Sequence, residues 1–392
     1  MSKIKVNSLE GVGASTPAIS IDNTSGTCTA NITNNLSNRN LIINGAMQVA
    51  QRSAGPVAVS DNSNENYQTL DRFKTTFGNS AVGAANISQS TDAPTTLGFT
   101  KSHKTDVTTV NTTASGQQMI QITYRIEGQD LRSSGWNHLS ASSFLTLSFY
   151  FKTTKTGTSK LPIGLRTRHG TNYYYVQNVT VTDPTNWNRY TVTIPGNSNL
   201  QIDDANTAGM DINFSYYTGP DKDTSSEGSW GTTNAYSTSD STNYFDNTSN
   251  DMFITGVQLE VGSVATDFEH RSFGQELLLC QRYYQRFTSP GTYTYLCVGN
   301  MDNDGDSTQM IMNFRIPLRT NISSMDTTGT ATDYAIRRDS TQICDALPLF
   351  YTGTTHSCFL LFAKTGVGWS TGQCVLAVFA TSGAYLGFSA EL

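Results

Sequence analysis

The chain has 392 residues and a formal net charge of −6, and only 14% of its residues are charged. This fraction lies well below the roughly 25% of ordinary soluble domains, and the chain is rich in Thr, Tyr, Phe and Gly, so a coiled-coil rod or a solvated helical bundle is excluded. The acidic balance argues against a nucleic-acid-binding protein, which normally carries a basic face.

The first segment, residues 1–39, is small and polar, with one short apolar alternation at Ile19 and Ile21. It has no apolar core of a signal peptide, and no stretch of the chain approaches the ~18 apolar residues of a membrane span. Because so few apolar residues cannot bury a core alone, we expect an extended N-terminal arm that neighbouring copies or a docking partner must order.

Residues 40–270 contain many short segments in which apolar and polar residues alternate. In residues 120–126, Ile and Tyr alternate with Gln, Thr and Arg, and residues 190–194 and 211–216 repeat the pattern. Period-two alternation predicts half-buried antiparallel strands, and their repetition between polar turns predicts a jelly roll or β-sandwich. A long polar loop, residues 221–250, interrupts the strands; a loop of this length is either functional or mobile.

One helix is predicted within residues 271–291, which we interpret as helix and linker. Ser272 is a good N-cap, and Gln275 follows at the capping-box spacing. From residue 292 to 392 the β texture returns as a C-terminal β domain. The predicted fold class is therefore all-β: an extended arm, an antiparallel jelly-roll or β-sandwich domain, one short linking helix and a second β domain.

Cofactor and metal sites are not expected. The six cysteines form no C-x-x-C pair and suit buried free thiols. One weak calcium candidate groups Asp302, Asp304 and Asp306 around a glycine, as oxygen ligands for Ca²⁺ would be. It lacks the distal Glu of a calcium loop, so an acidic turn is the simpler interpretation.

No catalytic group stands out, and we expect a protein that is not an enzyme. Residues 368–372 match G-x-S-x-G, but a strand rather than a helix is predicted to follow, and the last histidine, His356, lies upstream. A glycosidase pair would need two carboxylates at a fixed distance, which sequence does not give. A polysaccharide depolymerase stays an alternative, because scattered carboxylates could form such a pair: Asp203, Asp204, Asp221 and Glu227.

Two segments resemble a known protein family more closely than their β-strand composition alone would suggest. Residues 39–52 (RNLIINGAMQVAQR), followed by LDRF at 70–73, and residues 255–284 together resemble the virion-fibre proteins of tailed bacteriophages, especially podophages of marine bacteria. Residues 312–319 also resemble the C-terminal β domain of that family. In the family, the first segment opens a jelly-roll domain, and the second closes it and continues into a short helix.

The resemblance implies a homotrimeric tail fibre or spike, present in the virion after assembly in the host cytoplasm. The arm would attach to a tail or capsid adaptor protein, and the β domains would contact a host cell-surface glycan or lipopolysaccharide, with no nucleic acid and no membrane insertion. A capsid-surface (head) fibre or decoration protein stays open as an alternative location.

Aromatic side chains on polar loops are the predicted glycan contacts, because exposed rings stack on sugar faces. The alternative for each is a lid over the core. Trp230, on the longest polar loop, is the first candidate and has no evident core role. Since charged residues are few, we expect binding to depend only weakly on salt. The candidates are Trp136, Tyr173, Tyr175, Trp230, Tyr236 and Trp369.

Overall fold

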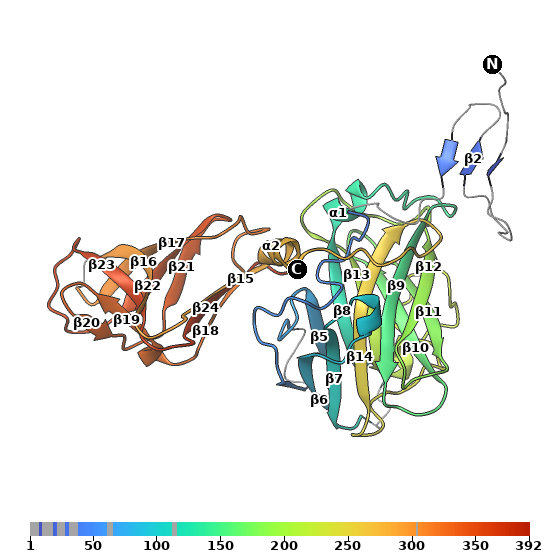
Figure 1. Cartoon of the computed structure of the whole chain (residues 1–392), viewed down its shortest axis with the longest axis horizontal. Coiled ribbons are helices and arrows are strands. Elements are labelled where there is room, and N and C mark those ends of the chain that lie inside the picture. Colours follow the sequence, from blue (N-terminus) through green and yellow to red (C-terminus); the bar gives the residue numbers. More distant parts are fainter. Residues whose placement is uncertain are drawn as a thin grey trace, which may run out of the picture.

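The computed structural model describes residues 8–9, 19–21, 28–30, 38–60, 66–111, 116–302 and 305–392, so most of the predicted arm lies outside the described residues. Within the arm, β1 (Ser8–Leu9), β2 (Ile19–Ile21) and β3 (Cys28–Ala30) pair as a small antiparallel sheet. Two β lobes follow, joined at helix α2 (Phe273–Gln281) (Figure 1). The all-β fold class is confirmed.

The first lobe is a sandwich of two antiparallel sheets (Figure 1). One sheet has five strands in the order β11-β10-β13-β8-β5, and the other has six in the order β12-β9-β14-β7-β6-β4. The strands of the five-stranded sheet are β5 (Phe73–Gly78), β8 (Met119–Glu127), β10 (Ser159–Thr167), β11 (Tyr174–Val181) and β13 (Ala208–Thr218). Those of the six-stranded sheet are β4 (Val57–Ser60), β6 (Ala84–Ser90), β7 (Ser102–Thr109), β9 (Phe144–Thr153), β12 (Asn188–Pro195) and β14 (Asp251–Val261). Short helical turns lie at α1 (Gly128–Ser133), η2 (Thr95–Leu97) and η3 (Pro220–Lys222).

The core of this lobe lies between the two sheets, on the apolar side of the predicted alternation. Ile122 of β8 and Phe214 of β13 are buried there, and the ring of Phe214 meets that of Phe149 from the opposite sheet edge-on, with centroids 5.0 Å apart. The predicted strands at 120–126, 190–194 and 211–216 are therefore present, with their apolar faces inward.

The polar faces of β8 and β13 are buried, although the alternation predicted that they would face solvent. Gln121, Thr123 and Asn213 keep only 5%, 2% and 1% of their surface exposed. The loop of residues 219–250 lies over this face and is held to β11 by two backbone hydrogen bonds: Tyr174 N donates to Gly231 O at 2.7 Å, and Gly231 N donates to Tyr174 O at 2.9 Å. The strands of the five-stranded sheet are thus covered on both sides, because a polar loop packs where solvent was expected.

The second lobe packs a seven-stranded sheet, in the order β20-β19-β23-β16-β17-β22-β21, with a three-stranded sheet, β15-β24-β18. β15 (Tyr284–Thr288) lies inside the predicted linker of residues 271–291 but pairs with β24, so this lobe begins before residue 292. The other strands are β16 (Thr294–Met301), β17 (Ser307–Asn313), β18 (Ser324–Thr327), β19 (Tyr334–Arg337), β20 (Thr341–Ile343), β21 (Leu349–Gly353), β22 (Ser357–Ala363), β23 (Cys374–Phe379) and β24 (Tyr385–Ser389), with a turn at η4 (Ala331–Asp333).

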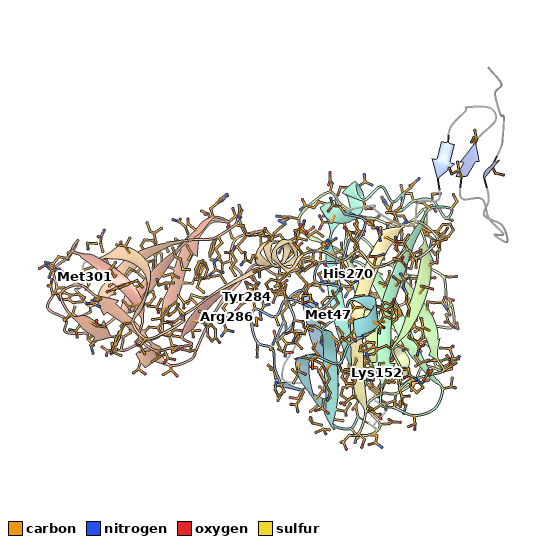
Figure 2. The ribbon with its side chains drawn as sticks, in the orientation of Figure 1. Met47, Lys152, His270, Tyr284, Arg286 and Met301 are labelled. Atoms are coloured by element: carbon orange, nitrogen blue, oxygen red, sulfur yellow. The ribbon has the colours of Figure 1, made fainter. Side chains whose placement is uncertain are left out.

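The joint between the lobes is built from the two segments that carry the family resemblance. Leu41 N donates to Leu259 O at 2.9 Å, and both Asn38 N and Asn40 N donate to the carboxylate of Glu269. α2 begins with the predicted capping box, in which Ser272 and Gln275 each accept from the other's backbone N–H. Figure 2 labels Tyr284 at this joint and Met301 at the far end of the second lobe.

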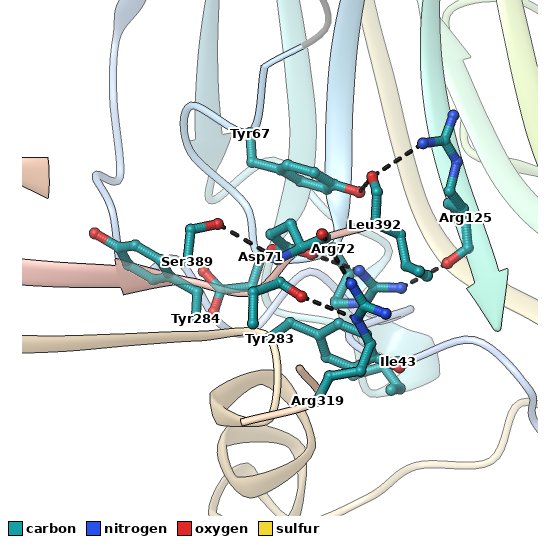
Figure 3. Close-up of polar contacts among 12 residues, drawn as sticks. Ile43, Tyr67, Asp71, Arg72, Arg125, Tyr283, Tyr284, Arg319, Ser389 and Leu392 are labelled. Carbon is teal, nitrogen blue, oxygen red and sulfur yellow. Dashed lines mark hydrogen bonds and ion pairs between the residues drawn. The ribbon is translucent and has the colours of Figure 1, made fainter. Parts of the chain in front are cut away.

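The last residues of the chain return to the sandwich. Arg125 Nη1 of β8 donates to Leu392 O at 3.0 Å, beside the ring of Tyr67 (Figure 3). Asn206 Nδ2 of the first lobe donates to Arg319 O of the second lobe at 2.9 Å. These contacts add a second connection between lobes that α2 already joins. In the part of the chain that the structure describes, neither α1 nor α2 has the length and apolar content that crossing a membrane would require.

Candidate functional site

The candidate site is a cleft of about 270 Å³ on the outer face of the five-stranded sheet. Alternate residues of β8 and β13 form its floor, and the loop of residues 219–250 forms a wall. Asn79, Gln117 and Asn234 line it and are exposed, so the cleft opens to solvent. The other lining residues are Lys74, Met119, Gln121, Thr123, Arg125, Arg166, Arg168, Asp211, Asn213, Lys222 and Tyr236.

Strand register gathers these side chains. Asp211 of β13 lies directly opposite Arg125 of β8 on one side and Arg166 of β10 on the other. One row away, Thr123 lies opposite both Lys74 of β5 and Asn213 of β13. Because directly paired residues in antiparallel strands point to the same face, four strands deliver their polar side chains into one cleft.

The centre of the floor is a network of neutral polar groups. Asn213 Oδ1 accepts from Thr123 Oγ1 at 2.8 Å and from Gln121 Nε2 at 3.0 Å. Its Nδ2 donates to Gly164 O at 3.1 Å, which ties β13 to β10. Buried side chains that hold one another in this way are fixed in orientation, as a preorganised binding surface requires.

The charge of the lining is strongly unbalanced. Five cationic side chains line the cleft, together with the single carboxylate of Asp211. Arg125 binds that carboxylate through two nitrogens, Nε to Oδ1 at 2.5 Å and Nη2 to Oδ2 at 3.1 Å, and Arg168 Nη1 lies 3.6 Å from Oδ2. Asp211 is therefore already engaged by two arginines. The cations of the lining are Lys74, Arg125, Arg166, Arg168 and Lys222.

Among the described residues, Arg166 and Lys222 form no ion pair with a carboxylate, whereas Arg125 and Arg168 both pair with Asp211. Arg166 Nε is buried without a hydrogen-bond partner, while its Nη2 donates to the Asn172 amide oxygen at 2.9 Å in the amide orientation that satisfies both groups. Burial lowers the pKa of Lys222, and the nearby Arg166 guanidinium lowers it further. Burial and the positive charge of Arg166 thus act on Lys222 in the same direction, and the Asp221 carboxylate offsets part of their effect on its pKa.

The wall is held close to the sheet at Tyr236. The backbone of Tyr236 packs on Gly164 of β10, where an added Cβ would lie 3.3 Å from the Tyr236 Cα, so a larger residue at 164 would push the loop outward. Burial raises the pKa of the Tyr236 phenol to about 12. The hydroxyl therefore stays protonated at neutral pH and can donate a hydrogen bond into the cleft.

The predicted aromatic contacts separate into core and cavity residues. Trp136 is buried and donates from Nε1 to Ser143 O at 3.2 Å, and Tyr175 is buried with its hydroxyl donating to Thr193 O at 3.2 Å. Both belong to the core of the first lobe, so these two rings are core side chains and not exposed contacts. Tyr236 is also buried, but it lines the cleft.

Trp230 lines a second cavity of about 290 Å³ next to the cleft. Its ring packs on Tyr175 with centroids 5.4 Å apart, and its Nε1 donates to Pro195 O at 2.7 Å. The expectation that Trp230 has no core role is therefore wrong. Tyr174, in the lining of the second cavity, contacts Tyr236, in the lining of the cleft, with ring centroids 5.7 Å apart, so the two cavities are neighbours.

Tyr173 and Trp369 are half-buried and pack against the cores of the first and second lobes, respectively. Neither lines the cleft. Of the six aromatic candidates, Tyr236 lines the cleft and Trp230 lines the second cavity, and the other four line neither.

The calcium candidate is a turn with internal partners. Asp302 Oδ1 accepts from Gln309 Nε2 at 2.9 Å, and Asp306 Oδ1 accepts from Gly366 N at 2.8 Å, while Asp304 lies outside the described residues. Across the described ranges, no three His, Cys, Asp or Glu side chains are grouped as metal ligands.

The scattered acids also lie elsewhere than in the cleft. Glu227 accepts from Gln177 Nε2 and Asn178 N, and Asp203 accepts from Thr207 Oγ1, whereas Asp204 and Asp221 are exposed. The G-x-S-x-G segment at 368–372 is followed by the strand β23, as predicted.

A larger cavity, of about 980 Å³, lies at the joint between residues 38–43, α1 and α2. Its charged groups are engaged with one another and with the backbone: Arg271 Nη1 donates to Ile42 O at 3.1 Å and lies 3.6 Å from Glu276. This cavity lies among contacts that fix α2 to the first lobe and therefore belongs to the architecture of the joint.

Sequence reasoning missed the cations of the cleft. The alternation at 120–126 and 211–216 showed which residues share a face, and it included Arg125 and Asp211. Nothing in the sequence indicated that Arg166 and Lys222 would meet them, because their proximity depends on strand order and on the path of the loop.

Comparison with known proteins adds fold likeness only. No protein-family model matches the sequence, and no curated protein matches it. The enzymatically active domain of tailspike protein 4 from bacteriophage CBA120 is 13% identical over 57% of this chain and 22% of its own, with a TM-score of 0.29. A family 11 carbohydrate-binding module from Clostridium thermocellum is 12% identical over 53% of this chain and 95% of its own, with a TM-score of 0.27. The xylan-binding domain of a Paenibacillus barcinonensis protein is 11% identical over 55% of this chain and 100% of its own, also with a TM-score of 0.27. Likeness at this level says nothing about what this chain binds.

Proposed function

We propose that this chain is a structural subunit of a phage virion, a homotrimeric fibre or spike that binds a host-surface glycan through the cleft of its first lobe. The observation that carries the glycan assignment is the cleft itself, in which fixed amide and hydroxyl groups surround a space open to solvent. A saccharide presents many hydroxyl groups that both donate and accept, so it needs such a mixed and preorganised set of partners.

The neighbouring cavity strengthens this proposal. Trp230 and Tyr174 line it beside the cleft, so a glycan longer than one sugar would meet polar groups in one cavity and aromatic rings in the next. Stacking on rings and hydrogen bonding to amides are the two contacts that sugar rings make best.

The assignment to a virion fibre is supported by the resemblance of residues 39–52 and 255–284, which the structure brings together in one joint. Self-association is supported by the outer face of the seven-stranded sheet. There Val298, Ile311 and Phe359 lie in register across three strands, with Ile311 58% and Tyr351 69% exposed. A row of exposed apolar side chains on a sheet favours packing against another copy.

We propose a binding role rather than a catalytic one. Hydrolysis by paired carboxylates would need two acids beside the substrate, and the described lining of the cleft offers only Asp211, which two arginines already engage. Release of new reducing ends from host polysaccharide would favour the depolymerase alternative. Both the tail and the capsid surface stay open as the location.

The test of glycan binding uses a variant that fills the cleft from its rim. Asn234→Trp places a large side chain at an exposed lining position, and Thr332→Trp is the control at an exposed position in the second lobe. We expect the Asn234 variant to fold normally and to lose binding to immobilised host envelope polysaccharide, while the control binds as the unmodified protein does. Normal binding by the Asn234 variant would contradict the proposed site.

The test of assembly measures mass in solution. Light scattering should give three copies for the unmodified protein, and Ile311→Lys should weaken association because it places a charge in the apolar row. Thr332→Lys, which adds the same charge elsewhere, should leave association unchanged. Mass spectrometry of purified particles should find the protein in the virion; its absence would overturn the structural role.

A further inference from the structure

We propose that the cleft selects an anionic saccharide, one that carries a carboxylate, sulfate or phosphate group, and that Arg166 and Lys222 bind this group. The inference rests on the proposed glycan binding and deepens it by naming the chemical class of the ligand. The observation behind it is that Arg166 and Lys222 lie together in the lining, that neither forms an ion pair with a carboxylate of the described residues, and that Arg166 Nε has no hydrogen-bond partner.

The imbalance is local and not a property of the chain. The whole protein carries a net charge of −6, so gathering five of its 25 Lys and Arg side chains around one small cleft is a specific arrangement. Placing buried cationic side chains side by side costs free energy unless a counter-charge is present.

The carboxylate of Asp211 does not neutralise the positive charges of Arg166 and Lys222. Its two oxygens receive Arg125, and Arg168 lies within 4 Å, at 3.6 Å. Arg166 lies directly opposite Asp211 in the strand register, yet its Nε is buried and has no partner. A guanidinium N–H without an acceptor is the donor that a bound oxyanion would satisfy.

Lys222 reaches the same place from the loop. It keeps only 3% of its surface exposed, lies within cation–π distance of Tyr236 at 6.0 Å, and lacks a carboxylate partner among the described residues. The field of Arg166 lowers the pKa of Lys222, which indicates that the two charges are close. An anion between them would relieve this repulsion, and Tyr236 would add a neutral donor beside it.

A cleft of about 270 Å³ fits one sugar ring with its substituent rather than a long chain segment. The exposed amides of Asn79, Gln117 and Asn234 would receive the hydroxyl groups, while Arg166 and Lys222 would receive the acidic group. This proposal replaces the weak salt dependence expected from the sequence with a strong one at this site, since screening by salt acts directly on such charge pairs.

The test compares matched saccharides with the full-length protein by isothermal titration or saturation-transfer NMR. The probes are methyl glucuronide, glucose 6-sulfate and glucose 6-phosphate, with methyl glucoside as the neutral reference. We expect at least one anionic probe to bind about tenfold or more tightly than the neutral one. Which of the three binds best distinguishes a uronate, a sulfated polymer and a phosphorylated lipopolysaccharide core as the source.

Arg166→Gln should weaken binding of the preferred anion by about tenfold and leave the neutral probe unchanged, while Arg166→Lys should retain part of the preference. Lys222→Met is a second variant that removes a cation without opening the core. Lys160→Gln, at an exposed cation paired with Asp240 outside the cleft, is the control and should bind as the unmodified protein does. Raising NaCl from about 0.05 M to about 0.5 M should weaken the anion and not the neutral sugar.

Equal binding of neutral and anionic probes, with no effect of Arg166→Gln or Lys222→Met on folded protein, would overturn the anionic preference and leave the proposed glycan binding intact. Failure of every probe, together with failure to bind host polysaccharide, would overturn both.

Discussion

Arg72 of the first lobe and Glu391 near the end of the second form a buried ion pair, with Arg72 Nη1 2.5 Å from Glu391 Oε2. Arg72 keeps 1% of its surface exposed, and its guanidinium also stacks 3.5 Å from the ring centroid of Tyr283, which follows α2. The pair therefore connects the sandwich, the helix region and the C-terminal lobe at one point (Figure 3).

Removing one partner of this pair should loosen the two lobes. Glu391→Ala leaves the Arg72 charge buried, so we expect a loss of about 3–5 kcal/mol in the free energy of unfolding and faster proteolysis between the lobes. The double variant Arg72→Met/Glu391→Ala should recover much of this loss, because no unpaired charge remains. Asp339→Asn, in an exposed pair with Arg338, is the control and should change the melting temperature little. A normal melting temperature for Glu391→Ala would show that the pair does not hold the lobes.

Trp230 now has a structural role that can be measured. Trp230→Ala removes a ring packed on Tyr175 and a hydrogen bond to Pro195, so urea unfolding should show a loss of about 2–3 kcal/mol. Trp230→Phe keeps the ring and loses only the hydrogen bond, which should cost about 1 kcal/mol. Unchanged stability with weakened glycan binding would instead make Trp230 a ligand contact alone.

His103 of β7 predicts a pH dependence of stability. Burial lowers its pKa from 6.5 to about 4, and neither ring nitrogen has a hydrogen-bond partner. The unfolded chain therefore takes up a proton at higher pH than the folded chain, so this residue removes stability as the pH falls from about 6.5 to about 4, by about 3 kcal/mol in total. His103→Phe should abolish this part of the pH dependence.

Asp71 titrates in the same pH range and acts in the opposite direction. The difference between the unmodified protein and His103→Phe still isolates His103, because Asp71 is present in both. Burial raises the pKa of Asp71 from 3.8 to about 6, so its contribution to stability grows as the pH falls through that window. Denaturant midpoints of the unmodified protein and of His103→Phe from pH 7 to pH 4 measure the combined and the separate contributions of these residues to stability. Parallel curves for the two proteins would show that His103 is not buried as a neutral ring.

The capping box of α2 should contribute to the joint. Ser272→Ala removes the acceptor for the Gln275 N–H, and we expect a loss of about 1 kcal/mol in thermal or chemical unfolding. Ser272→Asp keeps an acceptor and places a negative charge at the helix N-terminus, so it should restore stability. A full loss in both variants would mean that the hydroxyl serves another contact.

Local pattern was sufficient for the strands and the helix start. The alternation at 120–126 identifies β8 because one face must be apolar, and Ser272 with Gln275 identifies the start of α2 because the unpaired N–H groups there need acceptors. Neither inference depends on where the rest of the chain goes.

Long-range packing decides which polar and aromatic side chains are buried and which line the cleft. Gln121 and Asn213 were expected in solvent, and they are buried because the loop with Lys222 and Tyr236 crosses their face. Trp136 and Trp230 share a polar sequence context, yet one lies in the core and the other beside a cavity. Local sequence does not distinguish these outcomes, because each depends on residues that are distant in the chain.

The joint between the lobes and the wall of the cleft are built from different segments of the chain. The segments 38–45 and 257–276 fix α2 to the first lobe, and the Arg72–Glu391 pair holds the second lobe to the first. The loop of residues 219–250, by contrast, packs on the outer face of the five-stranded sheet and forms the wall of the cleft. Ligand preference can therefore change by substitution or exchange of the loop without disturbing how the lobes are mounted. A chimaera that carries a different loop should keep the contacts between the lobes and change only the lining of the cleft.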